Sequence, residues 1–157
     1  MGDIMKKFCI LSFIFILVDR IIKLLVQNYI NGELYIIKNF FYLTYTKNSG
    51  AAFSILEGKQ FLLIIIGVLA SSFILMYMKK KNNYSIGYIM LFSGIIGNVI
   101  DRLLYNYVID YLGFIIFKNN MPIFNFADSL IVIGAIILII FSNDRGEDKN
   151  ENYLWRW

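Results

Sequence analysis

Four aspartates lie in or beside apolar stretches, and they are the residues of this sequence best suited to chemistry. They are Asp19, Asp101, Asp110 and Asp128. Polar groups within apolar segments are costly, so they indicate function or pairing. Two carboxyls held close together cannot both ionise easily, so one keeps its proton while the other can take a proton from water. A pair of these aspartates could therefore activate water for hydrolysis.

Amides and a cation accompany the aspartates at helical spacing. Gly94, Asn98 and Arg102 follow one another at intervals of four residues, so they share one face of a helix. Gly94 leaves room for a close approach to the backbone, and Arg102 can donate two hydrogen bonds to a carboxylate or carbonyl. Asn125 and Asp128, three residues apart, also share a face.

Each of these groups has a structural alternative. Asn125 can cap a helix, with Asp128 favoured in the first turn by the helix dipole. Asp101 and Arg102 can form an ion pair at the membrane interface. Gly94 can serve close packing of two helices.

The composition excludes several other chemistries. The chain has no histidine, which rules out Ser-His-Asp and Cys-His catalysis and histidine-ligated zinc. We therefore predict neither a metal nor another cofactor. The lone Cys9 lies in an apolar run and is expected to be an inert packing residue. The net charge is only +4, and no basic stripe with interleaved aromatics indicates nucleic-acid binding.

The elements that must position these residues are transmembrane helices. Hydrophobic residues make up 59% of the 157 residues and charged residues 17%, whereas soluble domains average about 45–50% and about 25%. A spanning helix needs about 20 mostly apolar residues. We predict a single membrane domain, all-α with a small β element. Its four spans cover approximately residues 8–29, 61–78, 84–104 and 126–142.

The first predicted span contains charges. Asp19, Arg20 and Lys23 interrupt its apolar run, which could also be a cleaved signal peptide. No small-residue cleavage site follows, so we favour an uncleaved span. Lysine and arginine can extend toward the interface, and Asp19 can pair with either cation.

Positive charges orient the four predicted spans. Lys6 and Lys7, the loop at residues 79–81 and the tail at 143–157 are basic, so we place them and both termini in the cytoplasm. Residues 30–60 and 105–125 then lie outside. Alternating apolar residues predict strands or a hairpin within 33–47 and a short strand at 113–117. All four aspartates reach the outer leaflet.

Five sequence blocks occur in order along this frame. They are Asp19-Arg20-x-x-Lys23, Asn48-Ser49-Gly50-Ala51-Ala52-Phe53-Ser54, Gly94-x-x-Gly97-Asn98-x-x-Asp101-Arg102, Val108-Ile109-Asp110 and Phe124-Asn125-Phe126-Ala127-Asp128-Ser129. The series resembles the bacterial lipoprotein signal peptidase (signal peptidase II) family. The resemblance runs from about residue 8 to 142.

The resemblance implies an aspartic endopeptidase of the bacterial cytoplasmic membrane. It would remove the signal peptide of diacylglyceryl-modified prolipoproteins just before the lipidated cysteine, near the outer face. The implied catalytic residues are Asp110 and Asp128. Positions that match the substrate- or inhibitor-binding or dyad-supporting residues are Asn48, Gly94, Asn98, Arg102 and Asn125. Positions that match structural polar residues are Asp19, Lys23 and Asp101. Membrane lipid and inhibitors of the globomycin type are implied partners, and we expect a monomer.

Three positions depart from the family pattern. Ser93 and Asn106 replace usual glycines, and Tyr111 replaces a usual phenylalanine. Asparagine tolerates a left-handed backbone, so the turn at Asn106 should survive. These changes affect local loop geometry and leave the dyad intact.

Other functions remain open from the residues alone. The acids could bind cations or relay protons in a transporter or channel, although they lie near one face. Ser49 or Ser54 could act with Lys23 in a Ser/Lys endopeptidase, but this needs a neutral lysine, and Asp19 would keep it charged. A non-catalytic membrane subunit would not need such clustered polar groups.

Overall fold

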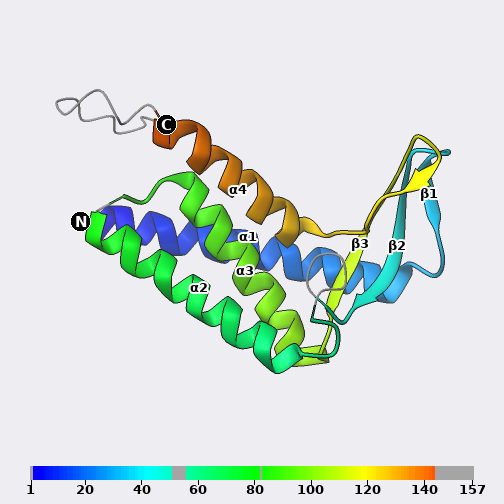
Figure 1. Ribbon diagram of the computed structural model, residues 1–157, viewed down its shortest axis with the longest axis horizontal. Helices are drawn as coiled ribbons and strands as arrows, with labels where there is room; N and C mark the ends of the chain where they lie inside the picture. Colours follow the sequence, from blue (N-terminus) through cyan, green and yellow to red (C-terminus); the bar gives the residue numbers. More distant parts are fainter. Residues whose placement is uncertain (1, 51–55, 82, 144–157) are drawn as a thin grey trace.

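The computed structural model describes residues 2–50, 56–81 and 83–143, and within them the chain forms four helices and one four-stranded antiparallel sheet (Figure 1). The helices are α1 (Gly2–Tyr29), α2 (Gln60–Lys81), α3 (Ile86–Tyr105) and α4 (Phe126–Asn143). The strands are β1 (Leu34–Ile37), β2 (Phe41–Asn48), β3 (Val108–Ile116) and β4 (Asn119–Asn120), in the order β1-β2-β3-β4. The predicted combination of helices with a small β element is confirmed.

Two of the described helices, α2 and α3, are long and apolar enough to cross a membrane. Helix α1 carries Asp19, Arg20 and Lys23, and the apolar part of α4 is shorter, residues 126–141. The predicted count of four spans therefore stays a prediction. The tail from 144 onward, together with Ala51, Ala52, Phe53 and Ser54 of the second sequence block, lies outside the described residues.

The helices form a bundle, and the sheet lies at one end of it (Figure 1). The first turn of α1, the last turn of α2 and the last turn of α4 lie at the opposite end. The basic residues 79–81 were predicted in a loop, but they form the last turn of α2. Cations are favoured there because the helix dipole places partial negative charge at the C-terminus.

Glycines bring α3 and α4 into close contact. A Cβ on Gly94 would clash with the carbonyl oxygen of Ala127 and lie 2.8 Å from Cγ1 of Ile131. Nearer the other end of the bundle, a Cβ on Gly87 would lie 2.9 Å from the carbonyl oxygen of Gly134. Small residues allow helix backbones to approach each other in this way. This packing sets the start of α4 beside the middle of α3.

A tight turn joins α3 to the sheet. Asn106 ends α3 in the left-handed conformation, with φ 61° and ψ 21°, and its backbone N–H donates to the carbonyl of Arg102. The prediction that asparagine would keep this turn is confirmed. Strand β3 begins two residues later and pairs with β2, with Thr46 opposite Asp110 and Asn48 opposite Val108.

The strand predicted at 113–117 is too short, and it starts too late in the chain. Strand β3 begins at Val108 and contains Asp110, for which the sequence analysis predicted only a place in the outer segment at 105–125. The reason is the tight turn at Asn106, which lets the chain pair with β2 at once. Beneath the sheet, Val26 of α1 packs against Ile109 and Tyr111 of β3. This buried cluster fixes the sheet on the end of the bundle.

Candidate active site

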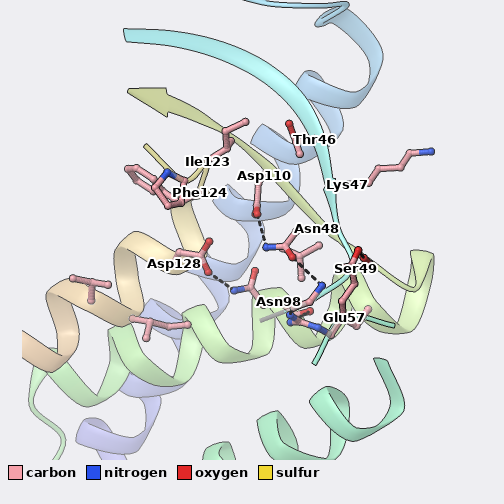
Figure 2. Close-up of a pocket in the computed structure, with 16 residues that line it drawn as sticks. Thr46, Lys47, Asn48, Ser49, Glu57, Asn98, Asp110, Ile123, Phe124 and Asp128 are labelled. Atoms are coloured by element: carbon pink, nitrogen blue, oxygen red, sulfur yellow. Dashed lines mark hydrogen bonds between the residues drawn. The ribbon is translucent and has the colours of Figure 1, made fainter. Parts of the chain in front are cut away.

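A cavity of about 670 Å³ lies where α3 and α4 meet the sheet (Figure 2). Asp110 enters it from β3 and Asp128 from α4, and Figure 2 shows both side chains directed toward the same space. Three other predicted site residues line it, namely Asn48, Asn98 and Arg102. The fold thus brings five predicted site residues from four different elements to one cavity.

Asp110 is buried and held by two amides. Its side chain accepts a hydrogen bond from Nδ2 of Asn48 at 2.8 Å and another from Nδ2 of Asn125 at 2.6 Å. Burial and the charge of Asp128 raise the pKa of Asp110 to about 6, although the two amide hydrogen bonds act in the opposite direction. This carboxyl therefore keeps its proton up to about pH 6, well above the range of an exposed aspartate.

Asp128 has one oxygen in the helix cap and one toward α3. Its Oδ2 accepts from the backbone N–H of Asn125 at 3.3 Å, and Oδ1 of Asn125 accepts from the backbone N–H of Asp128 at 2.9 Å. This reciprocal pair is a capping box, so the structural alternative for these two residues also holds. The other oxygen, Oδ1, accepts from Nδ2 of Asn98 at 2.7 Å. The cap and the amide together fix the carboxyl.

Asn125 links the two carboxyls although it is fully buried and does not line the cavity. Its Nδ2 donates to Asp110 at 2.6 Å and lies 3.4 Å from Oδ1 of Asn98, while its Oδ1 accepts from Asp128. Each carboxyl therefore has its own amide donors, and one buried amide joins both sides.

Arg102 connects the cavity to the segment after β2. Its guanidinium donates to the carbonyl of Gly50 at 2.8 Å and to that of Asn98 at 3.4 Å. Its Nε is buried with no hydrogen-bond partner among the described residues. The suggested ion pair with Asp101 is wrong, because successive residues on a helix point in different directions. Asp101 pairs instead with Arg20 and with Lys23.

Behind the cavity, Lys23 is fully buried instead of extending toward an interface. Its Nζ lies 2.8 Å from Oδ2 of Asp19 and 2.9 Å from Oδ2 of Asp101. Asp19 also accepts from the backbone N–H of Ala127, and Asp101 accepts from that of Ile109. Charged groups from α1 and α3 thereby hold the starts of α4 and β3, next to the two cavity aspartates.

Comparison with known proteins identifies the family. The sequence model of signal peptidase (SPase) II matches residues 11–143. The chain belongs to the signal peptidase II family. It is 42% identical over 137 residues to the lipoprotein signal peptidase of Halothermothrix orenii, covering 84% of this chain and 92% of that relative. It is 41% identical over 134 residues to that of Clostridium novyi, covering 80% and 90%. The predicted family resemblance is confirmed.

A solved structure shares the fold. It is described as a bacterial membrane enzyme determined by the in meso method at 2.3 Å resolution. The match has a TM-score of 0.81 and 28% identity, and it covers 94% of each chain. The chain is therefore a membrane protein of a protease family that cleaves lipoprotein signal peptides.

Within this signal peptidase II fold, Gly94 lies apart from the cavity-lining residues. It packs against the backbone of Ala127, as the close-packing alternative suggested. Its contribution to the site is indirect, because it lets α4 approach α3. Among the described residues, no three His, Cys, Asp or Glu side chains gather as ligands for a metal ion.

Sequence reasoning missed several residues of the site. The carbonyl of Gly50 holds Arg102, and an apolar wall consists of Ile123, Phe124, Ile131 and Val132. Tyr111, a departure from the family pattern, accepts a hydrogen bond on its hydroxyl from the backbone N–H of Phe126 at 3.1 Å. Its hydroxyl thus satisfies a free N–H at the start of α4. In the sequence, only the presence of a tyrosine in place of the usual phenylalanine pointed to this hydrogen bond.

Proposed function

We propose that this chain is an aspartic endopeptidase that removes the signal peptide from diacylglyceryl-modified prolipoproteins, cutting just before the lipidated cysteine. Asp110 and Asp128 are the proposed catalytic pair. The observation that carries the proposal is that both carboxyls line one cavity, each held by its own amide donors. Membership of a family that cleaves lipoprotein signal peptides supports the choice of substrate.

The mechanism uses the two carboxyls as an acid and a base. The ionised carboxyl takes a proton from a water molecule, whose oxygen attacks the scissile carbonyl carbon. The protonated carboxyl donates a hydrogen bond to the carbonyl oxygen as negative charge develops there. Collapse of the tetrahedral intermediate breaks the C–N bond, and the leaving amine receives a proton from the pair. The raised pKa of Asp110 supports a singly protonated pair, which titrates as a unit.

Polar and apolar parts of the cavity suit a membrane-anchored peptide. The buried Nε of Arg102 is a free donor for a substrate carbonyl. Ile131 and Val132 of α4 continue the cavity along the bundle, where the apolar part of a signal peptide can lie. The diacylglyceryl chains can then remain in the surrounding lipid while the bond to be cut reaches the aspartates.

The proposed location is the bacterial cytoplasmic membrane, with four spans and both termini in the cytoplasm. The N-terminal part of α1, which contains Lys6 and Lys7, and the basic last turn of α2 lie at the same end of the bundle, in keeping with the positive-inside rule (Figure 1). At the other end, the sheet and its turns expose apolar side chains, among them Ile36 of β1 and Phe40 and Phe117 of the turns. Such a surface suits contact with the outer leaflet. The proposed enzyme is a monomer, because residues of one chain line the cavity.

The Ser/Lys alternative receives no support from the contacts. Lys23 is held between Asp19 and Asp101, while the hydroxyl of Ser49 donates to Glu57. Ser54 lies outside the described residues. No described contact joins Lys23 to a serine.

Purified protein mixed with a lipidated prolipoprotein tests the proposal. We expect cleavage before the lipidated cysteine, inhibition by a cyclic peptide of the globomycin type, and resistance to serine-directed reagents. Asp110→Asn and Asp128→Asn should each abolish cleavage while expression and membrane insertion remain unchanged. Normal turnover by either variant would remove the dyad assignment. Loss of cleavage on treatment with serine reagents would favour the Ser/Lys mechanism instead.

A further inference from the structure

Lys23 contacts the catalytic network without lining the cavity. Besides its two ion pairs, its Nζ donates a hydrogen bond to Oδ1 of Asn98 at 3.2 Å. The same Asn98 donates from Nδ2 to Oδ1 of Asp128 at 2.7 Å. One amide side chain therefore separates a fully buried ammonium group on α1 from a proposed catalytic carboxyl on α4.

The chemistry of lysine decides how the Asn98 amide is turned. An ammonium group only donates hydrogen bonds, so the amide atom that faces it must be the oxygen. Nδ2 of Asn125 approaches the same oxygen at 3.4 Å, which favours the same orientation. The NH₂ group of Asn98 must then point to Asp128. Without Lys23, the amide could rotate by half a turn and present its oxygen to the carboxyl.

We propose that Lys23 is a positioning residue that holds the NH₂ group of Asn98 toward Asp128 and so favours the ionised form of that carboxyl in the resting enzyme. The proposal rests on the function proposed above for Asp110 and Asp128. A hydrogen bond donated to a carboxylate stabilises its charged form, whereas an amide oxygen turned toward it would destabilise that form.

Other charged groups surround this network and must be separated from the effect of the amide. Besides Lys23 and Asp128 themselves, they are Asp19 and Arg20 of α1, Asp101 and Arg102 of α3, and Asp110 and the titratable Tyr111 of β3. The charge of Lys23 also acts on the aspartates directly through space. A direct charge effect does not need Asn98, and this difference is the basis of the test.

The experiment measures kcat/KM on a lipidated prolipoprotein peptide between pH 4.5 and 8.5. The acidic limb of this profile is the pH range in which kcat/KM rises as the base ionises. In Lys23→Met, loss of the aligned donor should move the acidic limb to higher pH by about one unit, so that kcat/KM at pH values below the limb falls roughly tenfold. Asn98→Leu removes the same donor and should cause a similar shift. The double variant Lys23→Met/Asn98→Leu should then show no shift beyond that of Lys23→Met alone, because that single variant has already lost the direct effect of the charge. This non-additivity is the signature of action through the amide.

Arg20→Gln is the matched control. It removes one positive charge from the same helix and an ion pair from the same Asp101, but the described contacts of Arg20 reach only Asp101 and Tyr105. It should lower stability and leave the position of the acidic limb unchanged. An equal shift in Arg20→Gln, or an unchanged limb in Lys23→Met, would overturn the proposal. Additive shifts in the double variant would overturn it as well, in favour of direct charge.

Removal of Lys23 alone leaves two buried carboxylates short of a partner and could prevent folding. Asp19→Asn/Lys23→Met removes one charge of each sign and keeps an acceptor for Ala127, so it provides the same test, with Asp19→Asn as its reference. The proposed function fails separately, through activity in Asp110→Asn. If the two aspartate variants are inactive but the acidic limb of Lys23→Met does not move, only the proposed role of Lys23 is refuted.

Discussion

Replacement of Asp110 by asparagine should abolish cleavage and at the same time stabilise the folded protein near neutral pH. The carboxyl is 2% exposed, and its pKa is raised from 3.8 to about 6, chiefly by burial. An acid whose pKa is higher in the folded state costs stability once it ionises. The cost is small below about pH 4, grows as the pH rises, and is complete above about pH 6. Asparagine has no such ionisation, so it avoids this cost.

The magnitude follows from the two pKa values of Asp110. The difference between 3.8 and about 6 corresponds to about 3 kcal/mol at pH 8 and to about 0.5 kcal/mol at pH 4. Asparagine offers one acceptor oxygen where the carboxylate accepts from both Asn48 and Asn125. The lost hydrogen bond costs about 1 kcal/mol at every pH. Asp110→Asn should therefore be about 2 kcal/mol more stable than the wild type at pH 8 and about 0.5 kcal/mol less stable at pH 4.

The assay is reversible unfolding in mixed micelles at pH 4, 6 and 8, followed by circular dichroism, beside cleavage of a lipidated peptide. Cleavage by Asp110→Asn should fall by at least about a thousandfold. Glu33→Gln is the matched control, because it makes the same chemical change on an exposed side chain that does not line the cavity. It should change neither quantity appreciably. A difference in unfolding free energy between Asp110→Asn and wild type that stays constant from pH 4 to 8 would refute the argument that ionisation of the buried carboxyl costs stability.

Three further substitutions extend these expectations. Asp128→Asn should abolish cleavage without affecting insertion, and infrared spectroscopy should show the pKa of Asp110 falling, because the Asp128 charge helps to raise it. Asp101→Asn should destabilise the protein by about 3 kcal/mol in the same unfolding assay, because it breaks a buried ion pair. It should nevertheless retain far more turnover per folded molecule than Asp128→Asn; an equal loss would mean that the wrong carboxyl was chosen. Gly94→Ala should lower the unfolding free energy by about 1–3 kcal/mol, because its Cβ would clash with the Ala127 carbonyl. An unchanged unfolding midpoint would contradict that packing.

Local features of this protein could be predicted because they depend on short stretches of chain. The interval of four residues placed Asn98 and Arg102 on one face of α3, and both line the cavity. The interval of three between Asn125 and Asp128 predicted the helix start, where the two residues form a reciprocal cap. Asn106 was expected to keep a left-handed turn, and it does. In each case backbone geometry over a few residues is sufficient.

Other features depended on where distant segments meet. Asp110 was expected only in the outer segment at 105–125, before the predicted strand at 113–117, but the turn at Asn106 and pairing with β2 put it on a strand. Asp101 was a candidate partner for its neighbour Arg102, yet it pairs with Lys23, which lies 78 positions earlier in the chain. Sequence proximity could not decide this, because adjacent helical residues point in different directions.

By itself, then, the sequence determined the residue types, the helical faces and the order of the blocks, and these are enough for the family and for two candidate aspartates. The tertiary structure decided which groups contact those aspartates. The chain of contacts from Lys23 through Asn98 to Asp128 joins three helices, and every step in it spans at least 30 residues. Such contacts arise only when the glycine-lined packing of α3 against α4 and the packing of the Asp19 and Lys23 face of α1 against α3 bring the helices together. A hydrogen bond requires its two heavy atoms to lie within about 3 Å of each other. The spacing of residues along one helix does not determine how far they lie from residues of another helix.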